Sequence, residues 1–185
     1  MLKRVIIGQV LLIICCIIYI LWWYRGFRPE STVSRVGGVN GILLFLTMAF
    51  GAAGLALTLI SLPRSADPII NPMYIIIAGI VGYVVLLLIT KIGFHRAVTT
   101  ELFLITGWTM MEVAVVNRLN AAANLSLIGM IVMLSVIAAA FLISMVLYVA
   151  YYRMDEMKAF YAAMVPLVTE GATMALLVGM MIKKV

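Results

Sequence analysis

Charged residues are scarce in this 185-residue chain. Asp, Glu, Lys and Arg together make up 11% of it, whereas hydrophobic residues make up 66%. An ordinary soluble domain carries about 25% charged and roughly 45–50% apolar residues. The composition therefore excludes a water-soluble globular fold. The basic residues lie at the ends of the apolar blocks, so the formal net charge of +6 indicates anchoring at a membrane interface and no binding to nucleic acid.

Cysteine and histidine are nearly absent. The two cysteines, Cys15 and Cys16, are adjacent inside the first apolar block, which excludes a disulfide framework and predicts small apolar packing residues. His95 is the single histidine, so we expect an interfacial side chain and neither a metal site nor a hydrolytic triad. No nucleophile elbow, glycine-rich phosphate loop or zinc-binding spacing occurs. We therefore expect no cofactor, and the signal for an enzyme is weak.

Long apolar blocks are what the sequence has in abundance. Each is about 20 residues or longer, which at 1.5 Å per helical residue crosses the ~30 Å hydrocarbon layer. The ten-residue alternation of a membrane β-barrel is not visible. The sequence predicts an all-α, polytopic transmembrane helix bundle of about six spans, with 1–185 as a single integral membrane domain. The predicted helices are 5–24, 41–62, 69–90, 98–118, 125–152 and 160–182.

The orientation of the bundle does not follow from its charges. Six crossings place both termini on one side of the membrane, and the 13 Lys and Arg residues divide almost evenly between the two sides. The positive-inside rule needs a bias, so it predicts no orientation here. Because the loops are short and no soluble domain is appended, we expect a multi-pass protein of the cell membrane, in particular of a bacterial cytoplasmic membrane.

Small residues recur at four-residue spacing in three of the predicted helices. Such spacing allows the close backbone approach on which helix association in lipid depends. The sequence therefore predicts packing seams, either inside the bundle or between two copies in a homodimer. The seams are Gly171, Ala175 and Gly179; Ala78 and Gly82; and Ala49 and Ala53 with Ala52 and Ala56 beside them.

Most polar residues expected within the bilayer belong to segment 98–118. Glu101 and Glu112 are three helical turns apart, so they project within about 20° of each other. Trp108 shares this stripe and Thr109 borders it. Glu101 lies near the helix end, where pairing with a neighbouring base is the simpler interpretation. Glu112 lies deep, where a charge costs at least about 2.5 kcal/mol, so its position indicates a function.

A third carboxyl, Glu170, follows Pro166 by one turn in the last helix. Proline lacks an N–H, so we expect a kink there and a freed carbonyl at Ala162. Counted from the helix ends, Glu112 and Glu170 differ in depth by only about 5 Å. The sequence therefore predicts that the two carboxyls share one site with Thr109 and the freed carbonyl. Two carboxyls in a low dielectric do not both ionise cheaply, so at least one should carry a proton.

Three arginines, Arg25, Arg28 and Arg35, occupy the longest loop directly after Trp22 and Trp23. Guanidinium groups at a membrane interface can bind lipid phosphates, so these arginines are candidates for holding a lipid head group or an anionic solute. Plain interface anchoring explains them as well and is the simpler interpretation.

A membrane helix bundle supports many functions, so the substrate does not follow from the fold. Intramembrane carboxyls are the usual means of moving protons, cations or amines. The leading hypothesis is a small transporter or ion-conducting protein, proton- or cation-coupled, acting on a small solute or cation. One alternative is an intramembrane lipid-acting enzyme with Glu112 and Glu170 as acid and base. Another is a structural or accessory membrane subunit.

Overall fold

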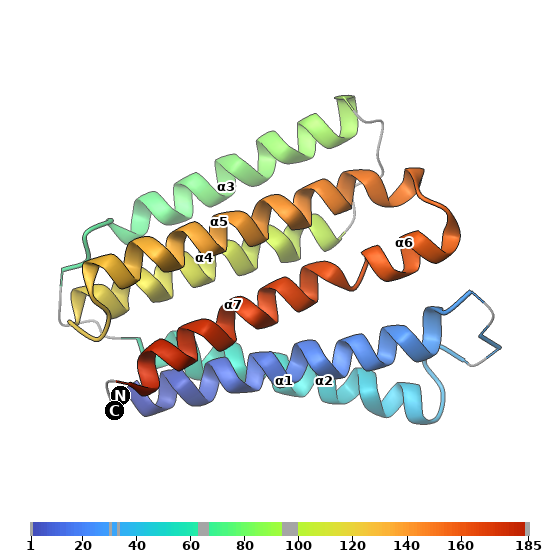
Figure 1. Ribbon diagram of the computed structural model, residues 1–185, viewed down its shortest axis with the longest axis horizontal. Helices are drawn as coiled ribbons and strands as arrows, with labels where there is room; N and C mark the ends of the chain where they lie inside the picture. The colour runs from blue at the N-terminus through green and yellow to red at the C-terminus, as the bar shows by residue number, and fades with distance from the viewer. Residues whose placement is uncertain (1, 30, 33, 63–66, 94–99, 184–185) are drawn as a thin grey trace. The chain divides into compact units, whose positions relative to one another are not determined.

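The chain is an all-α protein with six helices long and apolar enough to cross a membrane, as the sequence predicts. The computed structural model describes residues 2–29, 31, 32, 34–62, 67–93 and 100–183, and among these residues there is no strand (Figure 1). The six candidate spans are Leu2–Phe27, Val39–Ile60, Pro72–Gly93, Glu101–Ala121, Leu127–Ala150 and Glu156–Ile182. The protein is therefore a multi-pass membrane protein.

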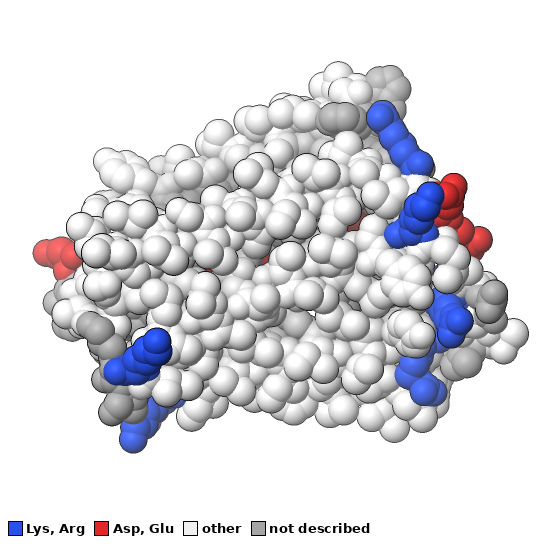
Figure 2. Space-filling model, in the orientation of Figure 1, with Lys and Arg blue, Asp and Glu red and all other residues white. Residues whose placement is uncertain are grey.

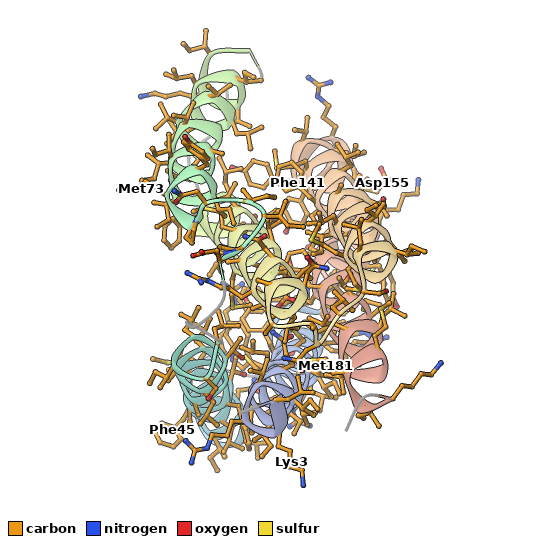
Figure 3. The ribbon with its side chains drawn as sticks, turned by 90° about the vertical axis from the view of Figure 1, so that its left-hand side faces the viewer. Lys3, Phe45, Met73, Phe141, Asp155 and Met181 are labelled. Carbon is orange, nitrogen blue, oxygen red and sulfur yellow. The ribbon has the colours of Figure 1, made fainter. Side chains whose placement is uncertain are left out.

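The outward faces of the helices are strongly apolar. Phe45 is 70% exposed, Ile60 72% and Ile128 75%, and Figure 3 shows Phe45 and Met73 pointing away from the packed helices. Lys and Arg lie near the ends of the helices, and the surface between is largely uncharged (Figure 2). Soluble proteins rarely expose apolar surface on this scale, whereas lipid tails cover it without cost.

The helices pack as two compact units, Met1–Leu62 with Tyr151–Val185, and Pro63–Ala150. The first contains α1 (Leu2–Phe27), α2 (Val39–Ile60), the 3₁₀ turn η2 (Tyr151–Arg153), α6 (Glu156–Ala162) and α7 (Val165–Ile182). The second contains α3 (Pro72–Leu88) with its π-helical end η1 (Ile89–Gly93), α4 (Thr100–Ala121) and α5 (Leu127–Ala150). In the first unit α1 packs against α2 and α7, and in the second α4 packs against α3 and α5. The expected single domain stays a prediction.

The close contact between α1 and α2 centres on Gly8 and Gly54. A Cβ added to Gly8 would lie 2.7 Å from the Thr58 nitrogen and 3.0 Å from the Gly54 carbonyl oxygen. A Cβ added to Gly54 would lie 2.8 Å from Cγ of Leu12. One glycine from each helix therefore makes the close approach on which van der Waals packing in lipid depends.

The packing role of the seams predicted from four-residue spacing stays a prediction, because within the two units these residues make few close contacts. A Cβ at Gly82 or Gly179 would meet nothing within 4 Å, and one at Gly171 would only touch Cys16 at an ordinary 3.8 Å. The alanines of these seams, which are Ala49, Ala52, Ala53, Ala56, Ala78 and Ala175, are all exposed. Spacing along one helix does not reveal which face meets a neighbour, whereas Gly8 and Gly54 are matched across two helices. The homodimer role of the exposed seams stays a prediction.

Helix α3 begins three residues later than expected, at Pro72. The Asn71 side chain accepts a hydrogen bond of 2.9 Å from the Met73 N–H and caps the helix. Proline fits the first helical turn because its missing N–H would have no partner there. Asn71-Pro72 was therefore the stronger start signal in the sequence, ahead of the proline at position 68.

The last span is interrupted, where a continuous kinked helix was expected. Helix α6 ends at Ala162, and α7 starts at Val165 with Pro166 in its first turn. The Met164 N–H donates to the Tyr161 carbonyl, which tightens the turn. Four residues before Met164, the Phe160 carbonyl instead accepts a hydrogen bond of 3.3 Å from Nε1 of Trp23. The proline therefore starts a new helix, and α1 supplies a donor at the break.

Candidate functional site

Glu112 is completely buried, at 0% exposure, in the middle of α4. This helix is the most buried of the six spans: 44% of an 18-residue stretch of it is buried, against 11–28% for the corresponding stretches of the others. It is also the least apolar span, with a mean hydropathy of 1.3. Glu101, in the first turn of the same helix, is exposed. The two carboxyls of the predicted stripe therefore lie in opposite environments, and Glu112 is the candidate for function.

Trp108 lies one helical turn before Glu112, at a spacing that brings side chains together on one helix face. Its indole Nε1 is buried, and no described residue accepts a hydrogen bond from it. Buried donors nearly always have a partner, so an unpartnered one needs an explanation such as a water or a ligand. The helix face that carries Trp108 and Glu112 thus includes a hydrogen-bond donor that no described residue uses.

Thr109 lies on another side of α4, where it lines an apolar cleft of about 410 Å³ between α3, α4 and α5. Its hydroxyl donates to the Ile105 carbonyl at 2.8 Å, within its own helix. Thr106 also lines the cleft, as does Phe141, which lies between α5 and α3 in Figure 3. Glu112 and Trp108 do not line it. The cleft is therefore a feature separate from the buried carboxyl, and the predicted contribution of Thr109 to a site with Glu112 stays a prediction.

Glu170 is half-buried in α7, one turn after Pro166. The hydroxyl of Thr169, the preceding residue, donates to the Pro166 carbonyl at 2.9 Å. Helix α7 and Glu170 belong to the first compact unit, whereas Glu112 belongs to the second. The shared site of the two carboxyls therefore stays a prediction.

Arg25 lies in the last turn of α1, whereas Arg28 and Arg35 lie in the loop that follows. All three arginines are exposed, and each contacts a neighbouring residue of this region. The Arg25 Nε donates to Oδ1 of Asn40 at 3.3 Å. The Arg35 guanidinium lies 4.5 Å from the centre of the Phe27 ring, and that of Arg28 lies 5.9 Å from the Tyr24 ring. The aromatic residues at the end of α1 therefore pack against the guanidinium groups of Arg28 and Arg35.

A framework of hydrogen bonds holds this loop. Nε1 of Trp22 donates to the Arg35 carbonyl at 2.9 Å, and the Ser31 hydroxyl donates to the Arg25 carbonyl at 2.8 Å. Nδ2 of Asn40 donates to the Ser34 carbonyl at 2.8 Å, and Asn40 itself is 1% exposed. Sequence reasoning missed Asn40. It could have been found as the single amide side chain in the first turn of α2, a largely apolar helix.

Asn117 of α4 was also missed, although it is a polar residue in a predicted span. It is 1% exposed. Its Nδ2 donates to the Ile70 carbonyl at 2.7 Å, and its Oδ1 accepts from the Ile70 N–H at 3.1 Å. This double hydrogen bond fixes the segment that leads into α3, so Asn117 has a structural role.

Replacing Asn117 with alanine should lower the stability of the protein. The change leaves both polar groups of Ile70 without their partner, and each such group costs about 1–3 kcal/mol when buried. Asn120→Ala is the matched control, because Asn120 makes one bond, from Nδ2 to the Leu125 carbonyl. Thermal unfolding in detergent should show the larger drop for Asn117→Ala. If Asn117→Ala lowered the unfolding temperature by no more than Asn120→Ala does, this structural role of Asn117 would be contradicted.

His95 lies outside the described residues. Among the residues that are described, no group of three or more His, Cys, Asp or Glu side chains could hold a metal ion. No protein-family model matches the chain, and neither a curated protein nor a solved structure matches it. Any assignment of function therefore starts from the buried carboxyl, the cleft and the arginine loop.

Proposed function

We propose that this protein is a small membrane transporter or ion-conducting protein, proton- or cation-coupled through Glu112 of α4. The observation that carries the proposal is the complete burial of this carboxyl in the most buried of six apolar spans. Ionisable side chains within a membrane are costly and usually mark an ion or substrate pathway. A purely structural helix would contain an apolar residue at this depth at no such cost.

The polar neighbour of Glu112 supports the same function. A carboxyl that exchanges a proton or holds a cation needs a second polar group for water or substrate. The indole N–H of Trp108, one turn away, is such a group, since no described residue accepts a hydrogen bond from it. Glu170 is proposed as the second carboxyl of the pathway, on α7.

The test is transport by the purified protein in liposomes. Vesicles with an imposed gradient of H⁺, Na⁺ or K⁺ are followed with a pH-sensitive or potential-sensitive dye, alongside protein-free vesicles. We expect the protein to dissipate or use at least one of these gradients. Inertness toward all three would contradict the proposal.

A lipid-acting enzyme is the second candidate, and the apolar cleft beside Thr109 favours it. Its ~410 Å³ falls within the range of about 300–1,000 Å³ that is typical of ligand pockets. Met110 packs so closely on Gly79 that any side chain at position 79 would overlap it, so the glycine shapes the cleft. Mass spectrometry of lipids retained by the wild-type and Glu112→Gln proteins tests this candidate. Identical lipid profiles would remove its support.

A further inference from the structure

We propose that the end of α1 and the α1–α2 loop form a binding site for the phosphate-bearing head group of an anionic membrane lipid. The site consists of Arg25, Arg28 and Arg35 on the framework of Trp22 and Asn40. It is independent of the proposed transport function, because it lies at the end of α1 and uses none of the intramembrane carboxyls.

The charge of the loop is suited to an anion. Segment 25–35 contains three arginines and one carboxylate, Glu30, so its formal charge is +2; Glu30 lies outside the described residues. None of the three arginines forms an ion pair with a carboxylate of the described residues. Elsewhere in the same unit, Lys158 is paired with Asp155 at 2.7 Å. Among the described residues, the charge of these arginines is therefore not neutralised by a carboxylate, and the segment as a whole keeps a formal charge of +2.

The contacts of these arginines leave hydrogen-bond donors for a ligand. A guanidinium has five N–H donors. Arg25 uses its Nε on Asn40, which leaves the terminal NH₂ groups. The Arg35 guanidinium lies over the Phe27 ring, and no described residue accepts a hydrogen bond from its N–H groups. Paired N–H donors on a planar group match the oxygens of a phosphate better than any other side chain does.

The described part of the loop also packs closely on both flanking helices, which simple anchoring would not need. Gly38 has a φ of 58°, a left-handed conformation that favours glycine. A Cβ at Gly41 would lie 2.5 Å from the Val36 carbonyl oxygen, so the loop backbone packs directly on the start of α2. Arg35 packs beside Gly26, whose Cβ would lie 3.7 Å from the Arg35 Cα. Ordering the loop before binding reduces the entropy lost on binding.

The location selects a lipid over a free anion. The arginines follow Trp22, Trp23 and Tyr24 at the end of a membrane span, and tryptophan and tyrosine side chains prefer the head-group level of a bilayer. Figure 2 shows Lys and Arg side chains at the end of the first unit where Figure 1 draws this loop. A phosphate at that level is most abundantly a lipid phosphate, and positive charge there favours anionic lipids.

Lipid binding by native mass spectrometry of the full-length protein in detergent tests the site. Phosphatidylglycerol is titrated against phosphatidylcholine. We expect preferential binding of phosphatidylglycerol, and Arg25→Gln and Arg35→Gln should each weaken it by about tenfold. Arg153→Gln is the matched control, because Arg153 is an exposed arginine at the end of η2 in the same unit. It should change the affinity by less than about twofold.

Gly41→Ala distinguishes binding at a site of defined geometry from attraction by positive charge alone. The substitution keeps every charge but displaces the Val36 carbonyl, and with it the loop backbone. We expect a loss similar to that of Arg35→Gln, in protein shown by size exclusion and circular dichroism to remain folded. Equal weakening by Arg35→Gln and Arg153→Gln would overturn the site in favour of plain electrostatic attraction, whether or not Gly41→Ala folds. In a last experiment, inorganic phosphate is added as a competitor of the lipid. Competition at the same concentration as the lipid would overturn the assignment to a lipid.

Discussion

Replacing Gly8 with alanine should destabilise the protein, whereas the same replacement at Gly179 should leave it unchanged or stabilise it. The added methyl group at Gly8 would press on the Thr58 nitrogen and the Gly54 carbonyl, which are backbone atoms of α2 and do not rotate away. At Gly179 the methyl group would meet nothing within 4 Å. Overpacking typically costs about 1–3 kcal/mol. Alanine in a helix, by contrast, is favoured over glycine by about 1 kcal/mol.

Thermal unfolding in detergent measures this contrast directly. Gly54→Ala, on the other side of the contact, should behave like Gly8→Ala, because its Cβ would lie 3.0 Å from the Gly8 carbonyl oxygen. Gly82→Ala is a second control in an open position. Equal changes at Gly8 and Gly179 would show that the α1–α2 contact does not depend on the absence of side chains. A change of oligomeric state in Gly179→Leu would show that this glycine packs against a second copy.

The contrast also shows which part of the helix packing the sequence could predict. Composition and block length determine that a helix crosses the bilayer, because the cost of apolar side chains in water and of polar backbone in lipid depends only on the segment itself. All six spans were therefore predictable. Which glycine faces a neighbour depends on a residue from another helix. Gly8 has no small residue four positions away, so a pattern within one helix does not reveal it.

Helix ends were less predictable where two local signals compete. For α3, a proline at position 68 and the pair Asn71-Pro72 both fit a helix start, and the capping hydrogen bond from the Met73 N–H to Asn71 decides for the second. For the last span, Pro166 allows either a kinked helix or a new start. The break occurs with Trp23 donating to the Phe160 carbonyl. That donor comes from α1, so the sequence around Pro166 does not contain it.

The depths of the candidate site residues along their helices were predictable, and the sides of the helix on which they lie were less so. Depth along α4 identified Glu112, which is buried, and placed Glu101 near an end, where it is exposed. The sides of the helix were harder to assign. Thr109 lines the cleft toward α3, and Asn117 binds the segment before α3. Both contacts depend on where α3 packs, and the sequence of α4 alone does not show which helix lies on which of its sides.

The remaining large effect concerns the two deep carboxyls, which we expect to act together. Replacing Glu112 or Glu170 with glutamine should abolish transport and leave folding nearly intact. Glutamine has the size and polarity of a protonated glutamate and can make similar hydrogen bonds, so the packing around each residue should persist. It does not release a proton or neutralise a cation. The variants therefore remove the chemistry that an intramembrane carboxyl provides and keep its shape.

Glu156→Gln is the matched control for both variants. Glu156 is an exposed carboxyl in the first turn of α6, so the same chemical change occurs at the end of a span. Its transport should equal that of the wild type. The measurement is the initial rate of gradient dissipation in liposomes at several external pH values, with thermal unfolding as the check on folding. Wild-type rates and an unchanged pH profile in both Glu112→Gln and Glu170→Gln would show that the carboxyls are structural hydrogen-bonding groups. Loss of transport in Glu112→Gln alone would place the chemistry on α4 and contradict the joint site, because a carboxyl pair that shares one proton or cation does not work with either member missing.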